Sequence, residues 1–275
     1  LLSKRVYVCG DIAQMTTSVP FIYIIRELSF NFESSDRTHI QLISLGQVPV
    51  IVSNAGVYFR KFFEEDDYFQ RVKNEHEFQD LTESTKPGKA LRKGIYLTAV
   101  TKAESEDESD VLHYRLLRCS SNLSGPTDNF RATDQKIIQE INEAAKYVFE
   151  QETELNHVLA QIYENKKRTG TEEKESKARI KAHSDKTKDM PQDALIAFCT
   201  FYDWSDIQRL KPSSTERYDW CYKQTSGLTK LHFKLKKSVT DERLDKEFSV
   251  ILYPNSVFLI PLSTNRLYTH EIRPS

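Results

Sequence analysis

The sequence predicts an α+β fold with a jelly-roll core, supporting helices packed on one side, and a last core strand missing at the C-terminus. Three observations lead to this prediction: short apolar strands recur between residues 157 and 273, an amphipathic helix precedes them, and charged loops separate them. Strands at fairly regular intervals are typical of a sandwich or barrel rather than of βαβ units.

We divide the chain into an N-terminal extension, residues 1–39, and a larger domain, residues 40–275. Within that domain, residues 40–153 are expected to hold the first strands and the support helix, and residues 154–275 the jelly-roll core. Residues 40–63 (IQLISLGQVPVIVSNAGVYFRKFF) are rich in β-branched and aromatic residues interrupted by glycine and proline. This composition predicts a strand, a turn and a second strand.

The clearest helix is predicted over residues 134–151, with Thr133 as its cap and Asp134 at its positively polarised start. Its apolar residues share one face at helical spacing and include Ile137, Ile138, Ile141, Ala145, Val148 and Phe149. Two more strands, GIYLTAV and HYRLLR, flank the acidic loop ESEDESD within residues 94–118. We expect the helix to be a scaffold element that packs on a sheet.

Seven strands are predicted after this helix, one fewer than the eight of a jelly roll. A charged loop, 165–177, follows the first strand, and a loop containing proline, serine and tryptophan, 203–227, follows the third. The strands are expected at 157–164, 178–185, 194–202, 230–237, 248–254, 257–263 and 266–273.

The composition argues against several classes of protein. With a net charge of −1, the protein as a whole is not attracted electrostatically to nucleic acid or to anionic lipid. No apolar run approaches the roughly 20 residues that span a bilayer, so we expect no membrane partner. The cysteines form no CxxC pair, which argues against structural zinc or a disulfide-stapled secreted module and favours an intracellular location, cytoplasmic or nuclear; they are Cys9, Cys119, Cys199 and Cys221.

A candidate metal site begins with His183 and Asp185, which alternate on one face of a predicted strand. His270, in the last predicted strand, is the best candidate for a third ligand. Two imidazoles and one carboxylate form the facial triad that suits non-haem Fe(II), although zinc accepts the same ligands. A histidine two residues before an acidic residue also arises by chance, so the pair alone is weak evidence.

The order of these motifs resembles the double-stranded β-helix dioxygenases that use Fe(II) and 2-oxoglutarate, and their AlkB-like branch most closely. The resemblance rests on QIY (161–163) before the His-x-Asp strand, KARIKAHSDKTKDMP (177–191), and NRLYTH (265–270) before the distal histidine. It covers residues 155–275, with GVYFRKFF (56–63) as a lead-in. It implies His183, Asp185 and His270 as iron ligands and catalytic residues, with 2-oxoglutarate and O2 as co-substrates.

The resemblance also implies that the Tyr163 hydroxyl donates to a 2-oxoglutarate carboxylate; the alternative is an aromatic packing role. Gln161 stands where the family has asparagine. Family members carry an arginine roughly fifteen to twenty residues after the distal histidine, and we expect it beyond the end of this chain. Arg273 falls on the opposite face of a strand from His270. Within the chain, three weaker candidates could take the place of this arginine as the cofactor-binding cation: Arg266, Lys230 and Lys234.

We carry three functional hypotheses. The first is a dioxygenase that hydroxylates a C–H bond, with AlkB-like oxidative demethylation of a modified nucleobase as its reaction. The second is a protein side-chain hydroxylase with the same chemistry, and the third is a non-catalytic jelly-roll binding module. The segment 164–177, at the position of the AlkB-like lid, has mixed charge and no aromatic residue to stack on a base. Two other segments are candidate substrate-binding surfaces: the basic KTKDMP (186–191), for a phosphate backbone, and the aromatic stretch 202–222, for a peptide or a base.

Overall fold

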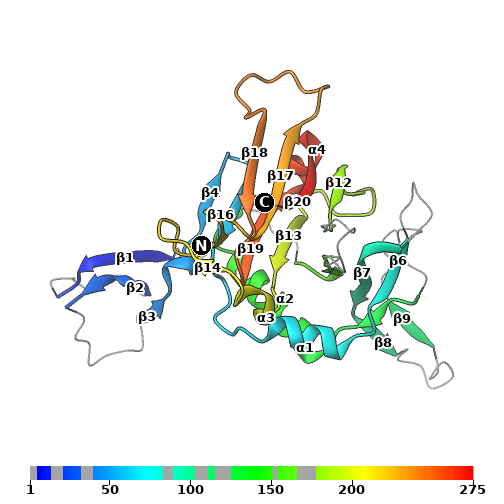
Figure 1. The fold of residues 1–275 in the computed structure, drawn as a ribbon, viewed down its shortest axis with the longest axis horizontal. Coiled ribbons are helices and arrows are strands. Elements are labelled where there is room, and N and C mark those ends of the chain that lie inside the picture. The colour runs from blue at the N-terminus through cyan, green and yellow to red at the C-terminus, as the bar shows by residue number, and fades with distance from the viewer. Residues whose placement is uncertain are drawn as a thin grey trace.

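The computed structural model describes residues 5–13, 21–31, 40–82, 89–102, 111–114, 125–150, 154–165 and 178–274. Over these residues the protein is mostly β, with several antiparallel sheets and few, short helices (Figure 1). The strand-rich character expected from the sequence is therefore confirmed, although "mostly β" describes the fold better than α+β. The jelly-roll connectivity stays a prediction.

Two four-stranded antiparallel sheets form the centre of the molecule. The first, the helix-covered sheet, has the order β13-β19-β5-β4, with bounds Leu195–Thr200, Ser256–Pro261, Gly56–Phe59 and Val50–Val52. The second, the hairpin sheet, has the order β12-β20-β17-β18, with bounds Ile180–His183, Tyr268–Pro274, Thr229–Leu235 and Glu247–Ile251.

The two sheets share one apolar core, and β19 is buried on both of its faces. Phe258 and Ile260 contact the hairpin sheet through Leu231 and Phe233, whereas the alternate residues Val257 and Leu259 belong to the cluster beneath the helices. Alternation along a strand accounts for this division. A strand that is covered on both faces has a continuous apolar sequence, as VFLI does here.

Gly56 is required where β5 passes β19. A Cβ atom at this position would lie 2.6 Å from the Leu259 carbonyl oxygen and 2.7 Å from the Phe258 ring. Both distances are shorter than real Cβ contacts, so any larger residue would push the two strands apart.

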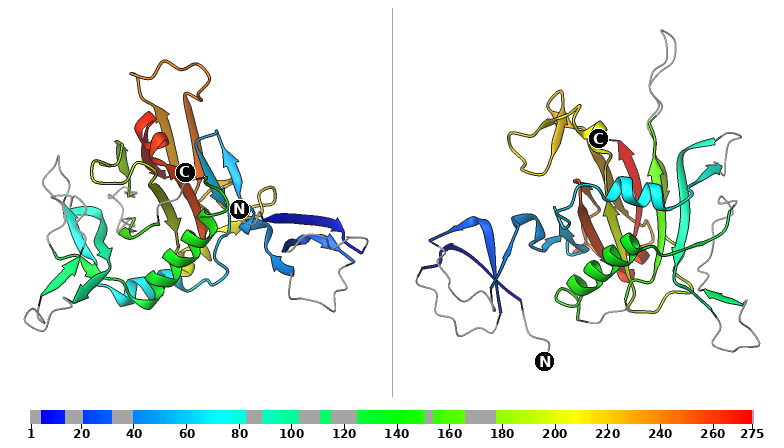
Figure 2. Two further views of the ribbon diagram at one scale, coloured as in Figure 1. Left: turned by 180° about the vertical axis from the view of Figure 1, so that it is seen from behind. Right: turned by 90° about the horizontal axis from the view of Figure 1, so that it is seen from below.

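Two helices cover the outer face of the helix-covered sheet: α1 (Tyr68–Glu75) and α2 (Ala132–Ala145) (Figure 2). The helix predicted at 134–151 thus begins two residues earlier and ends six residues earlier. Thr133 was wrongly predicted as its cap: Arg131 occupies that position, and its N–H donates to the Asp134 carboxylate (2.8 Å). Val148 and Phe149 lie beyond the helix and still pack on the same core.

A buried polar network joins the end of α1 to the start of α2. His76 Nδ1 lies 2.8 Å from Asp128 Oδ2, in β10 (Asp128–Asn129), and its Nε2 lies 2.7 Å from Asp134 Oδ2. Thr133 donates to Glu75 (2.6 Å). The two ring nitrogens lie within hydrogen-bond distance of one carboxylate each, so His76 connects two helices and a strand.

A third antiparallel group is built around β7 (Lys89–Thr98), which pairs with β6 (Gln79–Thr82) and β11 (His157–Tyr163) and, in parallel, with β10. We expected β11 as the first strand of the core, but its partner is β7. The hairpin of β8 (Val100–Lys102) and β9 (Leu112–Tyr114) follows. Residues 115–118 of the predicted second strand, and the acidic loop between these strands, lie outside the described residues.

The N-terminal segment includes a three-stranded parallel sheet of β1 (Val6–Asp11), β2 (Ile22–Phe30) and β3 (Ile40–Ile43). It stands at the opposite end of the molecule from β6 and β7 (Figure 2). Because β3 pairs with β2, residues 40–43 are structurally continuous with the extension, and the division at residue 39 stays a prediction. A short 3-10 turn, η1 (Leu45–Gln47), then leads into β4.

The remaining helices are short. The loop 203–227 folds into α3 (Trp204–Ile207) and a small sheet of β14 (Lys211–Pro212), β15 (Trp220–Tyr222) and β16 (Thr225–Ser226). The helix α4 (Leu262–Leu267) separates β19 from β20. Of the helices in the described ranges, none has the length and apolar character needed to cross a membrane.

Candidate metal centre

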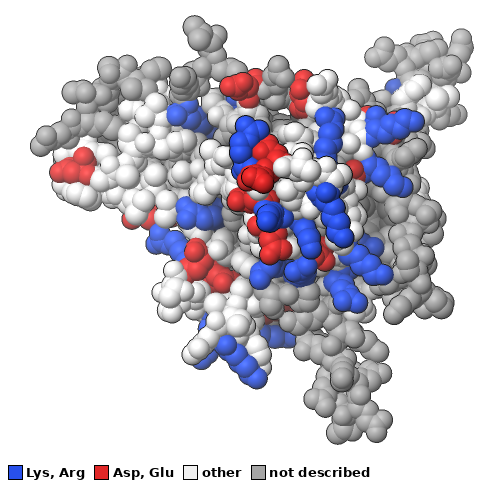
Figure 3. All heavy atoms as spheres, turned by 90° about the horizontal axis from the view of Figure 1, so that it is seen from above, with Lys and Arg blue, Asp and Glu red and all other residues white. Residues whose placement is uncertain are grey.

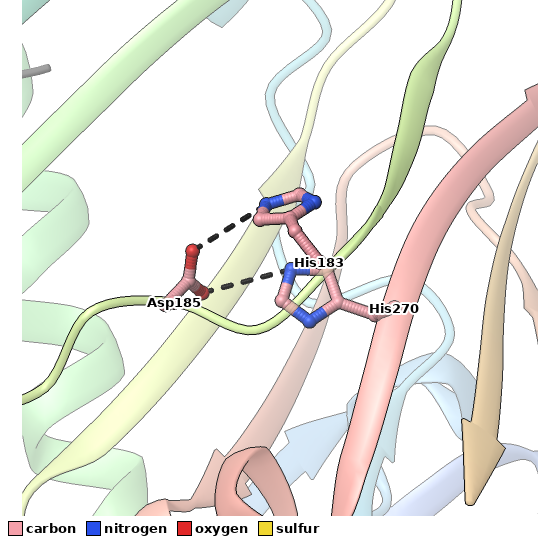
Figure 4. A group of neighbouring side chains, drawn as sticks. All are labelled: His183, Asp185 and His270. Atoms are coloured by element: carbon pink, nitrogen blue, oxygen red, sulfur yellow. Dashed lines mark ion pairs between the residues drawn. The ribbon is translucent and has the colours of Figure 1, made fainter. Parts of the chain in front are cut away.

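The structure brings the three predicted ligands together. His183, at the end of β12, lies directly opposite His270 in the antiparallel pair of β12 and β20, and their ring centroids are 4.5 Å apart. Asp185 follows β12 by two residues and turns its carboxylate toward both rings (Figure 4). We refer to these three residues as the triad.

The spacing of the triad fits one metal ion. Asp185 Oδ1 lies 3.6 Å from His183 Nε2, and Asp185 Oδ2 lies 3.6 Å from His270 Nε2. One donor atom from each residue lies within 4.8 Å of the other two. An ion about 2.1 Å from donors at right angles would hold them roughly 3.0 Å apart, so each of the two Asp–His distances would shorten by about 0.6 Å on binding.

The triad sits between the two central sheets and opens to solvent on one side. His270 is in register with Phe233 and contacts both the Phe233 and Phe198 rings, so it faces the shared core. Its side chain is 5% exposed, whereas those of His183 and Asp185 are 41% and 39% exposed. His270 is therefore anchored in the core, whereas His183 and Asp185 are accessible to solvent.

Hydrogen bonds hold the two exposed ligands in place. Asn265, which is buried in α4, accepts from the Asp185 N–H (3.0 Å) and donates to the Asp185 carbonyl (3.0 Å). Between the ligands, the Ser184 hydroxyl donates to the Tyr268 carbonyl (2.8 Å). His183 Nδ1 donates to the Lys181 carbonyl (2.8 Å), which leaves the Nε2 lone pair facing the centre. Asn265 is part of the motif NRLYTH, but its residue type alone did not predict this role.

The protonation states suit a cation. Burial lowers the pKa of His270 to about 4, so this ring is neutral at pH 7. Burial alone would raise the pKa of Asp185, but the hydrogen bond from His183 and the charges of both histidines lower it. The hydrogen bond with Asp185 raises the pKa of His183, despite the opposing effects of burial and of the Arg92 charge. His270 Nδ1 is buried without a hydrogen-bond partner among the described residues.

These shifts predict how metal affinity depends on pH. Because the His183 pKa lies above its ordinary value of 6.5, a proton competes with the metal below that pKa. Asp185 is already ionised and His270 already neutral between pH 5 and 7. Calorimetric titration with Mn2+ should therefore show affinity falling about tenfold per pH unit below the His183 pKa, with one proton released per metal. Constant affinity from pH 5 to 7 would contradict this protonation scheme.

Tyr163 and Gln161 alternate along β11 and therefore share one face of that strand. Burial raises the pKa of Tyr163 to about 12, the Arg92 cation opposes this rise, and the Asp185 charge adds to it. Gln161 accepts from Arg92 Nη1 (3.0 Å). Arg92 could not be predicted from the sequence, because nothing in its local pattern distinguishes it from other strand arginines.

The cations that we considered in place of the family's carboxylate-binding arginine do not lie at the triad. Arg266 belongs to α4 and its side chain is exposed, so the prediction that the last strand begins at residue 266 was wrong. Lys230 and Lys234 alternate with Phe233 on β17 and face away from the triad. Arg273 pairs with Glu271 on the same outer face.

Two other features from the sequence take definite positions. The aromatic stretch 202–222 lines a hollow of about 350 Å3 with Trp204, Tyr218 and Trp220, together with three cationic and three acidic side chains: Arg26, Lys61, Arg217, Glu27, Glu64 and Asp66. No triad residue lines it. Lys186 and Lys188 of KTKDMP are exposed, and residues 166–177 of the expected lid lie outside the described residues.

A second group of potential ligands consists of Glu75, His76 and Asp134. Both His76 nitrogens already face carboxylates, so we interpret this group as the structural network described above.

In comparisons with known proteins, no family model matches the chain, and no curated protein matches it either.

Proposed function

We propose that this protein is an Fe(II)- and 2-oxoglutarate-dependent dioxygenase, and that its two central sheets form the core of a double-stranded β-helix. The observation that carries the proposal is the triad: two imidazoles and one carboxylate converge between two sheets and leave one side open. This donor set suits Fe(II), which needs adjacent free positions for an oxo acid and O2.

Each residue has a role in this proposal. His183, Asp185 and His270 would hold the iron, while Asn265 fixes the backbone of Asp185. Tyr163 is half-buried and its raised pKa keeps it protonated at neutral pH, so it can donate to an oxo-acid carboxylate. Iron, when bound, would activate O2, which is the oxidant for C–H hydroxylation, and the oxo acid would supply two of the electrons by its decarboxylation to succinate.

The substrate is proposed by class. AlkB-like demethylation of a modified nucleobase is the first candidate, and hydroxylation of a protein side chain is the alternative. On the face shown in Figure 3, basic and acidic side chains lie side by side in the middle of the surface. This mixture differs from the continuous basic groove that a polyanion favours. An intracellular location, cytoplasmic or nuclear, is part of the same proposal.

The test is an anaerobic titration followed by turnover. The protein should bind one Fe(II), and it should then bind one 2-oxoglutarate only when the metal is present. Adding O2 with methylated oligonucleotides or candidate peptides should release succinate. Absence of stoichiometric iron, or 2-oxoglutarate binding that needs no metal, would favour the non-catalytic module. Hydrolysis with zinc would favour the other metal chemistry that this donor set permits.

A further inference from the structure

The hollow lined by the aromatic stretch lies where three parts of the chain meet. Strand β2, the segment 44–66 and the loop 203–227 each contribute side chains to its wall. Its volume of about 350 Å3 falls within the range of small-molecule sites, roughly 300–1,000 Å3. No triad residue lines it, so it is a site separate from the metal centre. We call it the tryptophan hollow.

Both tryptophans of the chain line this hollow, and both are half-buried. The ring centroids of Trp204 and Trp220 are 5.9 Å apart and the ring planes are at 74°, so the edge of one ring meets the face of the other. Side-chain caps fix both backbones: Asp203 accepts from the Ser205 N–H (2.9 Å), and Asp219 accepts from the Trp220 N–H (2.8 Å). The pair therefore forms a fixed apolar wall on which a planar ring can stack.

The cationic side chains of the tryptophan hollow have free hydrogen-bond donors. Arg26, Lys61 and Arg217 form no side-chain hydrogen bond and no ion pair with another described residue. Arginine and lysine groups of this kind bind oxyanions, and a phosphate group accepts from several of them at once. This part of the lining is therefore suited to a phosphate.

Two of the three acidic side chains in the hollow stabilise the fold. Glu27 accepts from the Ser44 hydroxyl (3.0 Å) with one carboxylate oxygen and from a backbone N–H (2.8 Å) with the other. Asp66 Oδ1 accepts from the Asn255 amide (3.1 Å). Glu64 is exposed and forms no such contact with another described residue. One carboxylate is thus free to accept from an N–H group of a ligand.

Tyr218 argues against a cationic ligand in the same hollow. The Arg60 guanidinium already lies over its ring, with Cζ 5.2 Å from the ring centroid. An aromatic cage for an ammonium group needs such ring faces to be open to the ligand. The three free cations would also repel an ammonium group. An anionic ligand with an aromatic ring fits the lining better.

We propose that the tryptophan hollow binds a mononucleotide, with its base stacked on the tryptophan pair and its phosphate held by Arg26, Lys61 and Arg217. A nucleotide combines a planar ring, N–H groups for Glu64 and a phosphate for the cations. A nucleotide within a nucleic-acid strand has the same chemistry, but the net charge of −1 favours the free mononucleotide. The inference goes beyond the proposed function, because it requires neither the metal nor the oxo acid.

Tryptophan fluorescence reports on this hollow alone, because it contains both tryptophans of the chain. Metal-free protein is titrated with AMP, GMP, CMP and UMP and with the matching nucleosides. At least one nucleotide should quench the emission saturably, and its nucleoside should bind about 10-fold more weakly because it lacks the phosphate. Inorganic phosphate, which has no ring to stack, should leave the emission unchanged.

Two variants separate the phosphate contact from the stacking contact. Arg217→Gln should weaken nucleotide binding about 10-fold and leave nucleoside binding unchanged. Trp220→Leu, measured by calorimetry, should weaken both ligands about 10-fold, the effect of losing a stacked base. The matched control is Arg209→Gln in the same loop, where Arg209 is exposed and pairs with Asp206 (3.2 Å). It should bind both ligands like the parent.

Several outcomes would overturn the proposal. Among them are no quenching by any mononucleotide at millimolar concentration, and quenching that both variants leave unchanged. A pentanucleotide that binds more than about 10-fold tighter than every mononucleotide would assign the hollow to a nucleic-acid strand instead. Quenching by tetramethylammonium but not by nucleotides would make it a cation site.

Two further measurements keep the test independent of folding and of the metal centre. Arg217 is exposed, so Arg217→Gln should keep the parent's melting temperature, and it decides the question if Trp220→Leu does not fold. His183→Ala should bind nucleotide like the parent. Loss of iron binding with intact nucleotide binding would therefore contradict the proposed function alone, and the reverse would contradict this inference alone.

Discussion

His183→Ala is expected to weaken Fe(II) binding by more than about 100-fold. Removing groups that merely orient a metal ligand already costs about 10- to 100-fold, and this change removes a donor itself. His183 is 41% exposed, so its truncation leaves no large cavity in the core. Anaerobic calorimetry or a competition assay with a metal-binding dye measures the loss.

The control for this prediction is His232→Ala. His232 lies on β17, next to β20 in the same sheet, but it faces the side opposite His270 and is hydrogen-bonded to Ser249 (2.8 Å). It should bind Fe(II) like the parent protein. If His183→Ala keeps full iron affinity, the triad is not the metal centre and the proposed function loses its basis.

His76→Phe is expected to lower the free energy of unfolding by about 3–5 kcal/mol. The substitution removes the ring that bridges Asp128 and Asp134 and leaves the buried Asp134 carboxylate with the Arg131 N–H as its only described hydrogen-bond donor, and breaking a buried pair by removing one partner is costly. Asp134 is 5% exposed and cannot recover its hydration. Chemical denaturation measures the loss, and thermal melting should fall by roughly 10 °C.

His113→Phe, on the exposed strand β9, is the matched control and should change stability by less than about 0.5 kcal/mol. Equal stability of His76→Phe and the parent would mean that the network adds nothing to the fold. A chelator-sensitive melting temperature that His76→Phe abolishes would instead assign a metal to Glu75, His76 and Asp134.

The two predictions concern different parts of one architecture. The His76 network fixes α1 and α2 against each other on the outer face of the helix-covered sheet, whereas the triad lies on that sheet's other side, where it meets the hairpin sheet. A loss of stability in His76→Phe should therefore leave the metal affinity of the folded fraction unchanged. A loss of metal in His183→Ala should likewise leave the unfolding of the metal-free protein nearly unchanged.

Local patterns predicted most strands of the two central sheets. The six strands expected from 178 to 273 are found, with ends shifted by a few residues, because alternation and β-branched runs are properties of short segments. The helix end and the Arg266 strand were wrong for a different reason. In both places packing decides where the element stops: Val148 and Phe149 pack on the core from a turn, and Asn265 turns inward from α4 to hold Asp185.

Residue type and strand alternation were enough to single out His183, Asp185 and His270 as candidate metal ligands. The tertiary structure alone decided that they meet, because β12 and β20 pair across more than 80 residues of chain. It also decided what surrounds them. Asn265, Arg92 and His76 act through partners distant in sequence, and no local pattern records a contact that exists only after the sheets have packed.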